Sequence, residues 1–317
     1  MKKFVCLFGL LVLLNLLWPD STYSNSEKRL LASFPAYNGG KFFADFEQYA
    51  ADQFPLRDYW RQLKAYFAHG CLGKVENNDL YFKDGYLFKM DYPLNQASVD
   101  HFQAIFADID APLLIIPDKN NYVDKAMKVD VETYCRLLKG SSLADLLSLE
   151  DYYYGDSHWR SERLGKVAAY IAKLFDKEYI PLDFIKAQSF RGVFALQSGI
   201  SCKTDYLYKP LITADCQDYQ GKTISLFNED LADYDAYLQG AQPLVKIKGQ
   251  GKGTLILFRD SFGSALLPHL ATMYETIYAL DLRYMNKKTI EQFVDLNEGD
   301  VLLLFSQTII NNSFGLK

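Results

Sequence analysis

The sequence predicts a layered α/β domain built around a parallel β-sheet. Three short apolar runs near the end of the chain, residues 254–258, 276–280 and 301–305, have the length of buried strands. Segments long enough for a helix separate these runs, and such alternation is typical of parallel strands flanked by helices. The 317-residue chain is 49% hydrophobic and 23% charged, which is a globular balance that allows a sizeable core. We therefore expect residues 254–306 to supply three parallel strands to one sheet.

The beginning of the chain has the pattern of an export segment. Lys2 and Lys3 precede an apolar run that extends from Phe4 to Trp18, and polar residues follow Pro19. This is the layout of a secretory signal peptide. The run is also only slightly shorter than a membrane span, so an uncleaved anchor is the alternative. We expect residues 1–24 to be a signal peptide or an N-terminal membrane anchor that packs against nothing in the domain, and residues 25–317 to form one domain outside the cytoplasm.

Residues 25–90 predict an α-rich N-terminal region. Aromatic and apolar residues recur at three- and four-residue steps over residues 42–49 and again over residues 59–67, as in amphipathic helices. Pro55 breaks the pattern between them. In residues 83–88 the Asp84-Gly85 pair indicates a turn that leads into a strand.

The middle of the chain continues the alternation of helices and strands. The pattern predicts a strand at residues 112–116, with Pro117 ending it, and Ser161 as the N-cap of a later helix. Helices are expected at residues 97–108, 130–147, 163–175, 265–274 and 288–296. Residues 176–250 show no sustained period, and we expect loops and short strands there.

Charge and cysteine usage exclude some classes of function. The net charge of −5 comes without a long basic run, which argues against binding to a nucleic-acid backbone. No cysteine pair has the spacing of metal ligands. Cys202 and Cys216 flank a loop-like stretch and could form a disulfide outside the cytoplasm, the alternative being free buried thiols.

A serine lies where an α/β sheet usually carries its functional groups, beyond the carboxyl end of a strand. The run 254–258 leads into a turn that contains Ser261, just before a predicted helix. Backbone amides at the start of a helix can hold an oxyanion, so Ser261 is a candidate nucleophile. The alternative is that Ser261 only caps the helix.

A serine nucleophile needs a base, and the chain has four histidines. His158 stands in a Gly-Asp-Ser-His-Trp stretch, and Asp156 projects to the same side because residues two apart in an extended segment do so. A carboxylate beside an imidazole fixes its tautomer and favours the imidazolium that forms during acyl transfer. The alternative is a loop histidine with a coincidental acidic neighbour. His69, His101 and His269 lie in or next to predicted helices.

Seven short motifs, in order along nearly the whole exported part, carry a resemblance to a known family. They occupy residues 27–35, 52–58, 83–88, 117–120, 155–159, 259–262 and 281–284. On these motifs the chain resembles the DHHW family and, more distantly, the SGNH-hydrolase-like alginate O-acetyltransferases of exopolysaccharide export. The resemblance implies an SGNH-hydrolase-like fold with a central parallel sheet and a permuted order, in which the Asp-x-His pair precedes the serine.

The resemblance places Asp156, His158 and Ser261 on the positions of a Ser-His-Asp triad. One departure is that Ser157 replaces the first histidine of Asp-His-His-Trp, so any role of that histidine is lost. Gly192 resembles a glycine that could supply an oxyanion amide, and Gln307 lies where an amide side chain would be sought. Further candidates for substrate or oxyanion contacts are Lys119, Trp159, Arg283 and Tyr284.

The function that the resemblance implies is an extracytoplasmic O-acyltransferase, most simply for acetyl groups, that modifies a cell-surface or secreted polysaccharide. A membrane-bound O-acyltransferase is implied as the acyl donor, because acetyl-CoA does not reach that side of the membrane. No cofactor or metal is indicated. A carbohydrate esterase with the same triad is one alternative, since water can attack the same intermediate. An inactive carbohydrate-binding or envelope-assembly protein on this scaffold is the other, since fold does not fix function.

Overall fold

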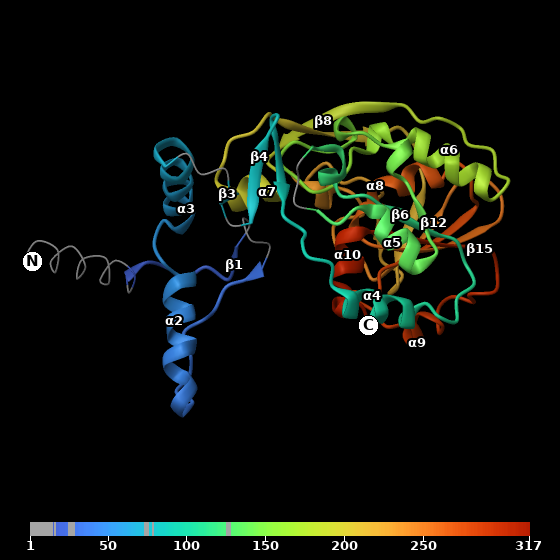
Figure 1. Cartoon of the computed structure of the whole chain (residues 1–317). Coiled ribbons are helices and arrows are strands. Elements are labelled where there is room, and N and C mark those ends of the chain that lie inside the picture. Colours follow the sequence, from blue (N-terminus) through green and yellow to red (C-terminus); the bar gives the residue numbers. More distant parts are fainter. Residues whose placement is uncertain (1–14, 16, 25–28, 73–75, 78, 125–127) are drawn as a thin grey trace, which may run out of the picture.

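The computed structural model describes residues 15, 17–24, 29–72, 76–77, 79–124 and 128–317. Figure 1 shows a layered body, which contains the C-terminus, and an N-terminal arm beside it. Most of the predicted export segment, residues 1–14 and 16, lies outside the described residues. Among the residues that are described, no helix combines the length and the apolar character that a membrane span requires.

The body is built on an eight-stranded sheet with the order β11-β10-β12-β14-β13-β15-β6-β7. Its strands are β6 (Leu113–Ile116), β7 (Ser141–Ser142), β10 (Asp215–Asp218), β11 (Thr223–Ile224), β12 (Leu244–Lys248), β13 (Thr254–Arg259), β14 (Thr276–Leu280) and β15 (Asp300–Ser306). The run from β14 to β7 is parallel throughout, whereas β12, β10 and β11 extend it by antiparallel pairing. The predicted parallel arrangement of residues 254–306 is therefore confirmed.

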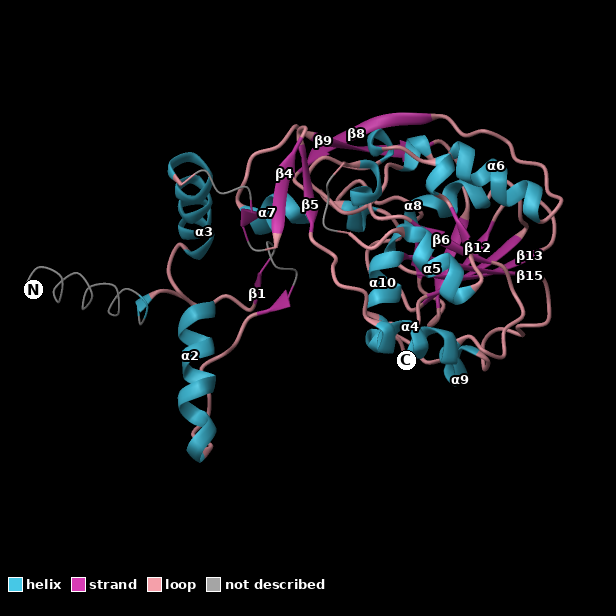
Figure 2. Cartoon of the chain, viewed as in Figure 1, coloured by secondary structure: helices cyan, strands magenta, loops and turns pink. Residues whose placement is uncertain are grey.

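Helices cover both faces of this sheet, because alternate residues of its strands point to opposite sides. Leu255 and Leu257 of β13 join one apolar cluster with α6 (Gly165–Leu174) and α8 (Ser261–Leu270). Ile256 and Phe258 join the other cluster, which includes residues of α4 (Gln96–Ile105), α5 (Val131–Leu138), α9 (Lys287–Ile290) and α10 (Gln307–Asn311). The helix–sheet–helix layering in Figure 2 is the predicted α/β class.

Several predicted helix boundaries are wrong. The helix expected at residues 130–147 ends at Leu138, because Lys139 adopts a left-handed φ of 55° and the chain then turns closely against Leu113 and Ile115 into β7. Short 3-10 turns follow as η4 (Ala144–Leu146) and η5 (Leu149–Asp151). Of the C-terminal helices, α8 begins at Ser261 rather than at residue 265, and α9 ends at Ile290 rather than at residue 296.

The predicted N-cap role of Ser161 is also wrong. Ser161 opens the 3-10 turn η6 (Ser161–Arg163), which precedes α6. Its buried hydroxyl instead donates a hydrogen bond to the carbonyl of Ala265 in α8 over 2.7 Å. The side chain therefore ties two neighbouring elements together instead of capping one of them.

The aperiodic segment 176–250 contains more regular structure than its sequence pattern predicts. It forms the hairpin of β8 (Phe184–Phe190) and β9 (Asp205–Pro210), with α7 (Val193–Ser198) between the two strands, and then β10, β11, η7 (Tyr234–Ala236) and β12. Of the two alternatives considered for Cys202 and Cys216, the structure has the free thiols rather than the disulfide. Cys216 is buried in the main core on β10, whereas Cys202 packs against the small cluster around α7.

The arm holds the predicted N-terminal helices, α2 (Phe42–Asp52) and α3 (Arg57–Tyr66), with η1 (Gly39–Lys41) before them and η2 (Phe67–Cys71) after them. At its base, β1 (Tyr23–Ser24) pairs with β2 (Arg29–Leu30), and the Ser21 amide donates to Gln53 over 2.9 Å. The expectation that residues 1–24 pack against nothing is therefore wrong for residues 21–24.

The β3–β5 sheet connects the arm to the body. Its strands are β3 (Glu76–Asn77), β4 (Leu80–Lys83) and β5 (Tyr86–Lys89), and the Asp84-Gly85 turn joins β4 to β5 as predicted. The Leu87 amide donates to the carbonyl of Tyr154 over 2.8 Å, which fixes the hairpin against the loop that carries Asp156 and His158.

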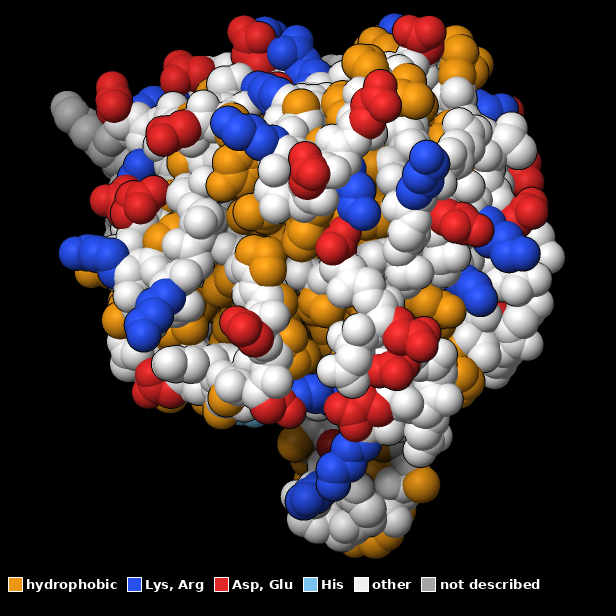
Figure 3. All heavy atoms as spheres, turned by 90° about the vertical axis from the view of Figure 1, so that its right-hand side faces the viewer, with side chains coloured by type: hydrophobic (Ala, Val, Ile, Leu, Met, Phe, Trp, Pro, Cys, Tyr) orange, Lys and Arg blue, Asp and Glu red, His pale blue; other side chains and the backbone are white. Residues whose placement is uncertain are grey.

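The face of the body shown in Figure 3 carries interspersed charges of both signs. Acidic and basic side chains alternate there with apolar ones, and neither sign covers the face. A mixed surface of this kind keeps a protein soluble without creating a strong field of one sign.

Candidate active site

Ser261 lies at the carboxyl end of β13, as the first residue of α8. Asp260 is the N-cap: its carboxylate accepts hydrogen bonds from the Phe262 amide at 2.9 Å and from the amide and hydroxyl of Ser306 at 2.8 and 2.6 Å. The capping role considered for Ser261 therefore belongs to Asp260. Because an N1 amide has no acceptor within its own helix, the Ser261 amide is left available beside its hydroxyl.

A buried arginine supports the turn from below. Arg259 is 1% exposed, and its guanidinium donates to the Ser264 hydroxyl over 3.0 Å and lies 3.6 Å from the Asp281 carboxylate. Gly263 permits this packing, because a Cβ at that position would stand 2.8 Å from the Cβ of Arg259. The strand-to-helix turn is thus held rigidly from the side that faces the core.

His158 connects Asp156 to Ser261. Its Nδ1 lies 2.6 Å from Asp156 Oδ1, and its Nε2 lies 2.8 Å from Ser261 Oγ. Both distances are within hydrogen-bonding range without a bridging water. The structure therefore brings together the three side chains predicted from the sequence, although 103 residues separate His158 from Ser261.

Asp156 is held in its ionised form. Burial opposes ionisation, but the adjacent His158 ring and hydrogen bonds from the amides of Val193 and His158 outweigh it, and the pKa of Asp156 lies well below its usual value. The carboxylate accepts the Val193 amide on Oδ2 at 2.9 Å, while Oδ1 faces the imidazole. An ionised carboxylate in this position orients the ring with Nε2 toward the serine.

Aromatic side chains hold the His158 ring in place. Tyr234 stacks on it with the ring centroids 3.7 Å apart and the planes 8° from parallel, and Phe262 lies 4.8 Å away at a tilt. The Tyr234 hydroxyl donates to the carbonyl of Phe262 over 3.3 Å. The sequence analysis missed Tyr234, because the residue comes from the aperiodic segment and its contact with His158 spans the fold.

Two of the predicted binding residues instead support the loop that carries His158. Lys119 is 1% exposed, and its ammonium donates to the carbonyls of Tyr153 and Asp156 at 3.1 and 2.7 Å. Trp159 is fully buried and donates through Nε1 to the carbonyl of Phe262 over 2.8 Å. Burial lowers the pKa of Lys119 to about 8. Neither side chain reaches the surface of the site.

The two candidates for oxyanion contacts, Gly192 and Gln307, both have packing or hydrogen-bonding roles in the structure. Gly192 packs against the Asp156 loop so closely that a Cβ would stand 2.3 Å from the carbonyl oxygen of Gly155. Gln307 is buried, and its Nε2 donates to the carbonyl of Val129 over 3.1 Å. Its Oε1 accepts hydrogen bonds from Asp118 and Asn121. Gly192 is therefore needed for packing, and the contact of its backbone amide with an oxyanion stays a prediction. The side-chain amide of Gln307 is already engaged.

The pair Arg283 and Tyr284 lies away from the serine cavity. Arg283 donates to Asp281 through Nε and Nη2 at 2.9 and 2.6 Å, and this carboxylate raises the pKa of Arg283 although burial acts against the charge. Tyr284 is 48% exposed, with the Arg283 guanidinium over its ring. Their motif therefore contributes an ion pair directly after the carboxyl end of β14.

A cavity of about 210 Å³ opens onto Ser261 and His158. Its size suits one small group rather than a drug-sized ligand, for which roughly 300–1,000 Å³ is usual. The cavity is lined by Lys89, Asp91, Asp118, Ser157, His158, Phe194, Ser261, Phe262, Ser306, Thr308, Ile309 and Asn312. The two aspartates were not predicted as site residues, although Asp118 lies in the motif at residues 117–120, immediately after β6 and before η3 (Lys119–Tyr122).

The arrangement can support nucleophilic chemistry at Ser261. A hydroxyl hydrogen-bonded to a neutral imidazole can transfer its proton as it attacks a carbonyl carbon. The free amide at the start of α8 and the positive end of the helix dipole can stabilise the resulting oxyanion. Within the described part of the chain, no three histidine, cysteine or acidic side chains cluster as a metal site would require.

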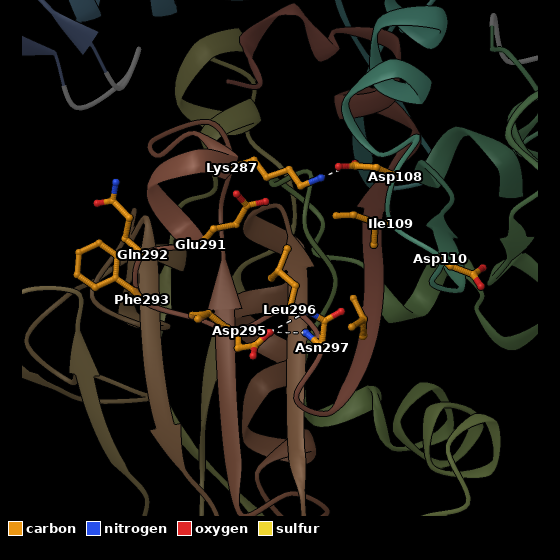
Figure 4. Close-up of a pocket in the computed structure, with 12 residues that line it drawn as sticks. Asp108, Ile109, Asp110, Lys287, Glu291, Gln292, Phe293, Asp295, Leu296 and Asn297 are labelled. Atoms are coloured by element: carbon orange, nitrogen blue, oxygen red, sulfur yellow. Dashed lines mark hydrogen bonds and ion pairs between the residues drawn. The ribbon is translucent and has the colours of Figure 1, made fainter.

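A larger hollow of about 810 Å³ lies at the other end of the strands, away from Ser261 (Figure 4). It is lined near the amino ends of β6 and β15 by residues such as Asp110 and Val301, and the Lys287–Asp108 ion pair spans its rim. Functional groups in open parallel sheets gather at the carboxyl ends of the strands. We therefore place the candidate active site at Ser261 rather than in this hollow.

Comparison with known proteins identifies the fold. No protein-family model and no curated protein sequence matches the chain. A DHHW family protein from Eubacterium siraeum superposes with a TM-score of 0.60 at 16% identity, over 76% of this chain and 95% of that one. PatB1 from Bacillus cereus, in a structure with a sulfonyl adduct, gives a TM-score of 0.56 at 17% identity, over 74% and 96% of the two chains.

Pseudomonas aeruginosa AlgX also matches, with a TM-score of 0.38 at 14% identity over 74% of this chain and 64% of that one. The fold assignment depends on the DHHW protein and PatB1, which are covered almost completely. The SGNH-hydrolase-like fold class expected from the resemblance is confirmed. At these identities the similarity concerns the fold, and the chemistry has to be argued from this chain's own residues.

Proposed function

We propose that this protein is a serine-dependent O-acyltransferase that transfers acetyl groups to hydroxyls of a cell-surface or secreted polysaccharide outside the cytoplasm. The observation that carries the proposal is the position of His158, with one ring nitrogen on Asp156 and the other on Ser261. The fold shared with PatB1 and with a DHHW family protein supports it.

The proposed reaction has two steps through an acyl-enzyme. Ser261 Oγ attacks the acyl carbonyl while His158 Nε2 takes its proton, and the Ser261 amide stabilises the oxyanion. His158 then gives the proton to the leaving group, and the acyl group remains on Ser261 as an ester. A sugar hydroxyl attacks this ester with His158 again as base, which forms the product ester and frees the serine. Asp156 remains ionised and orients the imidazole throughout.

The proposed partners are those that the family resemblance implies. The acceptor is a polysaccharide, and a membrane-bound O-acyltransferase supplies the acyl group on the far side of the membrane. The apolar start of the chain supports export. Intact-mass measurement on protein from its native host tests this part: a mass equal to the whole chain, together with recovery from the cytoplasm, would contradict it.

A carbohydrate esterase is the alternative favoured by one observation, the small size of the cavity. A cavity of about 210 Å³ admits water readily, and water that attacks the acyl-enzyme yields hydrolysis. Transfer and hydrolysis share every residue of the first step, and they differ in which nucleophile resolves the ester.

The nucleophile is tested by covalent labelling. Sulfonyl fluorides react with activated serine hydroxyls, and a sulfonyl adduct has been seen on PatB1. We expect phenylmethylsulfonyl fluoride to modify this protein once, on the peptide that contains Ser261, and Ser261→Ala to abolish both labelling and release of nitrophenolate from 4-nitrophenyl acetate. Ser201→Ala changes an exposed serine and is the matched control. Equal nitrophenolate release by wild type and Ser261→Ala would refute the proposal.

A further inference from the structure

Helix α3 of the arm presents an exposed apolar face. Between 46% and 71% of each of its large apolar side chains is exposed; these are Tyr59, Trp60, Leu63 and Tyr66, together with Phe67 at the C-cap. They follow an i, i+1, i+4, i+7, i+8 pattern, which places all of them on one side of an α-helix. Single exposed apolar side chains are ordinary, but a contiguous patch of this kind marks a surface that binds something.

The opposite side of α3 packs against the segment that contains α7. Ala65 is buried there, and a Cβ on Gly199, which follows α7, would stand 3.2 Å from the Cβ of Ala65. Arg61 donates through Nη2 to the carbonyl of Gln197 over 3.1 Å. Leu63 and Ala65 are two residues apart, so they point to nearly opposite sides of the helix. This contact holds α3 with its apolar face outward, in the arm that Figure 1 shows beside the layered body.

The composition of α3 is that of a helix that lies on a lipid surface. Its basic residues are Arg57, Arg61 and Lys64, and Asp58 is its one acidic residue. Lys64 follows Trp60 by four residues and therefore lies on the same side of the helix, one turn further along. Basic side chains beside Trp and Tyr rings are typical of helices that bury one face among lipid headgroups, and their charge attracts anionic lipids. With ten residues, α3 is too short to span a bilayer, which needs about twenty.

The apolar start of the chain indicates that the surface which meets this face is a membrane. The apolar run from Phe4 to Trp18 ends shortly before Ser21. Two hydrogen bonds join Ser21 to Gln53: its amide donates to Oε1 over 2.9 Å, and its carbonyl accepts from Nε2 over 3.0 Å. Gln53 comes just before α3, and Trp18 and Tyr59 line the same hollow of about 290 Å³. A bilayer that receives the apolar run therefore lies next to the apolar face of α3.

From this geometry we propose that the apolar face of α3 lies in the surface of a lipid bilayer that contains anionic lipids. The helix lies along the surface, with the rings of Tyr59, Trp60 and Tyr66 among the headgroups and Lys64 close to the lipid phosphates. The arm thereby holds the body beside the membrane, whether or not the export segment remains on the chain. This inference concerns a surface far from the serine cavity and does not depend on the chemistry at Ser261.

Quenching of Trp60 by brominated lipid measures where α3 lies. The chain has three tryptophans, Trp18, Trp60 and Trp159, and Trp159 is fully buried. In the full-length Trp18→Phe variant, Trp60 is therefore the one exposed tryptophan. This variant is added to vesicles of equal parts phosphatidylglycerol and phosphatidylcholine, with the phosphatidylcholine either brominated or unbrominated. We expect the Trp60 emission to shift to the blue on both vesicles and to be at least twofold weaker on the brominated ones.

Further substitutions in the Trp18→Phe background assign the quenching to this face. Trp60→Phe leaves only the buried Trp159 and should abolish it. Leu63→Ser places a hydroxyl in the middle of the apolar face and should lower the quenched fraction at least threefold. Leu211→Ser is the matched control, because Leu63 and Leu211 are both 52% exposed and Leu211 follows β9 in the body. The control should quench like its parent, and vesicles of phosphatidylcholine alone should quench less than the anionic ones.

Several outcomes would overturn the inference. A chain that stays in solution, or one that sediments with the vesicles while Trp60 is not quenched, does not place α3 in the bilayer. A blue shift of Trp60 without lipid, in a chain that sediments as a dimer, assigns the face to a second copy. Equal quenching in Leu63→Ser and Leu211→Ser removes the face from the interaction. Because the readout is the position of Trp60 and not turnover, Ser261→Ala should leave the quenching unchanged, and loss of the proposed function would not affect this result.

Discussion

Substituting Gly192 by alanine should disable the site without replacing any of its three reactive side chains. In the structure a Cβ on residue 192 would stand 2.3 Å from the carbonyl oxygen of Gly155 and 2.6 Å from the Cβ of Asp156. Ordinary contacts begin near 3.4 Å, so the added methyl group is about 1 Å too close to a backbone atom. The obstacle is backbone, and either α7 or the Asp156 loop has to move.

The magnitude follows from that displacement. Overpacking of this kind typically costs about 1–3 kcal/mol, which corresponds to a fall in Tm of roughly 2–10 °C for a domain of this size. A shift of about 1 Å at Asp156 also disturbs its contacts with His158 and with the Val193 amide, and such misplacement lowers catalytic rates by about a hundredfold. The loss of reactivity should therefore be large while the protein remains folded.

The assay combines thermal unfolding with the rate of sulfonyl fluoride labelling at Ser261. Gly315→Ala is the matched control, because a Cβ at that glycine meets nothing within 4 Å. We expect Gly315→Ala to match wild type in both measurements and Gly192→Ala to label about a hundredfold more slowly. A Gly192→Ala protein with the Tm and labelling rate of wild type would refute the packing argument.

Further substitutions test other supports of the site and of the arm. Asp156→Asn should lower turnover of 4-nitrophenyl acetate by about 10³–10⁴-fold with little change in circular dichroism, because an amide does not stabilise an imidazolium; a loss below tenfold would contradict its role. Tyr234→Leu removes a stacked ring worth about 1 kcal/mol and should slow labelling roughly fivefold, while Tyr234→Phe should stay within twofold of wild type. In the arm, hydrogen bonding from Arg29 lowers the pKa of Asp52 to about 2. A carboxyl group whose pKa is lowered by folding stabilises the folded state at pH values above its pKa in the unfolded chain. Hydrogen-exchange protection of the Ala32 amide, which donates to Asp52, should therefore be complete above about pH 4 and decline toward about pH 2. Protection independent of pH would count against this ion pair.

The sequence pattern predicted the elements that depend on residues close together in the chain. The strands β13, β14 and β15 were predicted because a strand buried on both faces has to be apolar throughout. Ser261 followed from the position of a strand end, and Asp156 from its two-residue spacing to His158. The helix expected at residues 130–147 failed because Lys139 adopts a left-handed conformation, which the apolar period does not report.

The roles of the remaining site residues could not be predicted from the pattern, because these residues act through contacts with segments that are distant in sequence. Gly192 lies in a stretch that resembles the family, but its packing role depends on the course of the Asp156 loop, which is distant in sequence. The amide of Gln307 looked available at a strand end, yet Val129 and Asp118 occupy it. The choice between a disulfide and free thiols was open for the same reason, since Cys216 lies in the core on β10 while Cys202 packs elsewhere.

The aperiodic segment 176–250 explains why so little of the site's support could be predicted. The loop that presents Asp156 and His158 has no regular structure of its own, and it is held from outside. Asp205 of β9 accepts the amides of Tyr154 and Gly155 at 2.8 and 2.7 Å. Val193 of α7 and Tyr234 of η7 contact the acid and the base directly. Each of these contacts meets a polar or planar requirement of the loop, and none needs an apolar period in its own sequence. A segment that mainly supports another loop therefore makes its contacts at single positions, and its sequence shows no apolar period. The buried strands of the sheet do show apolar runs, so they could be predicted.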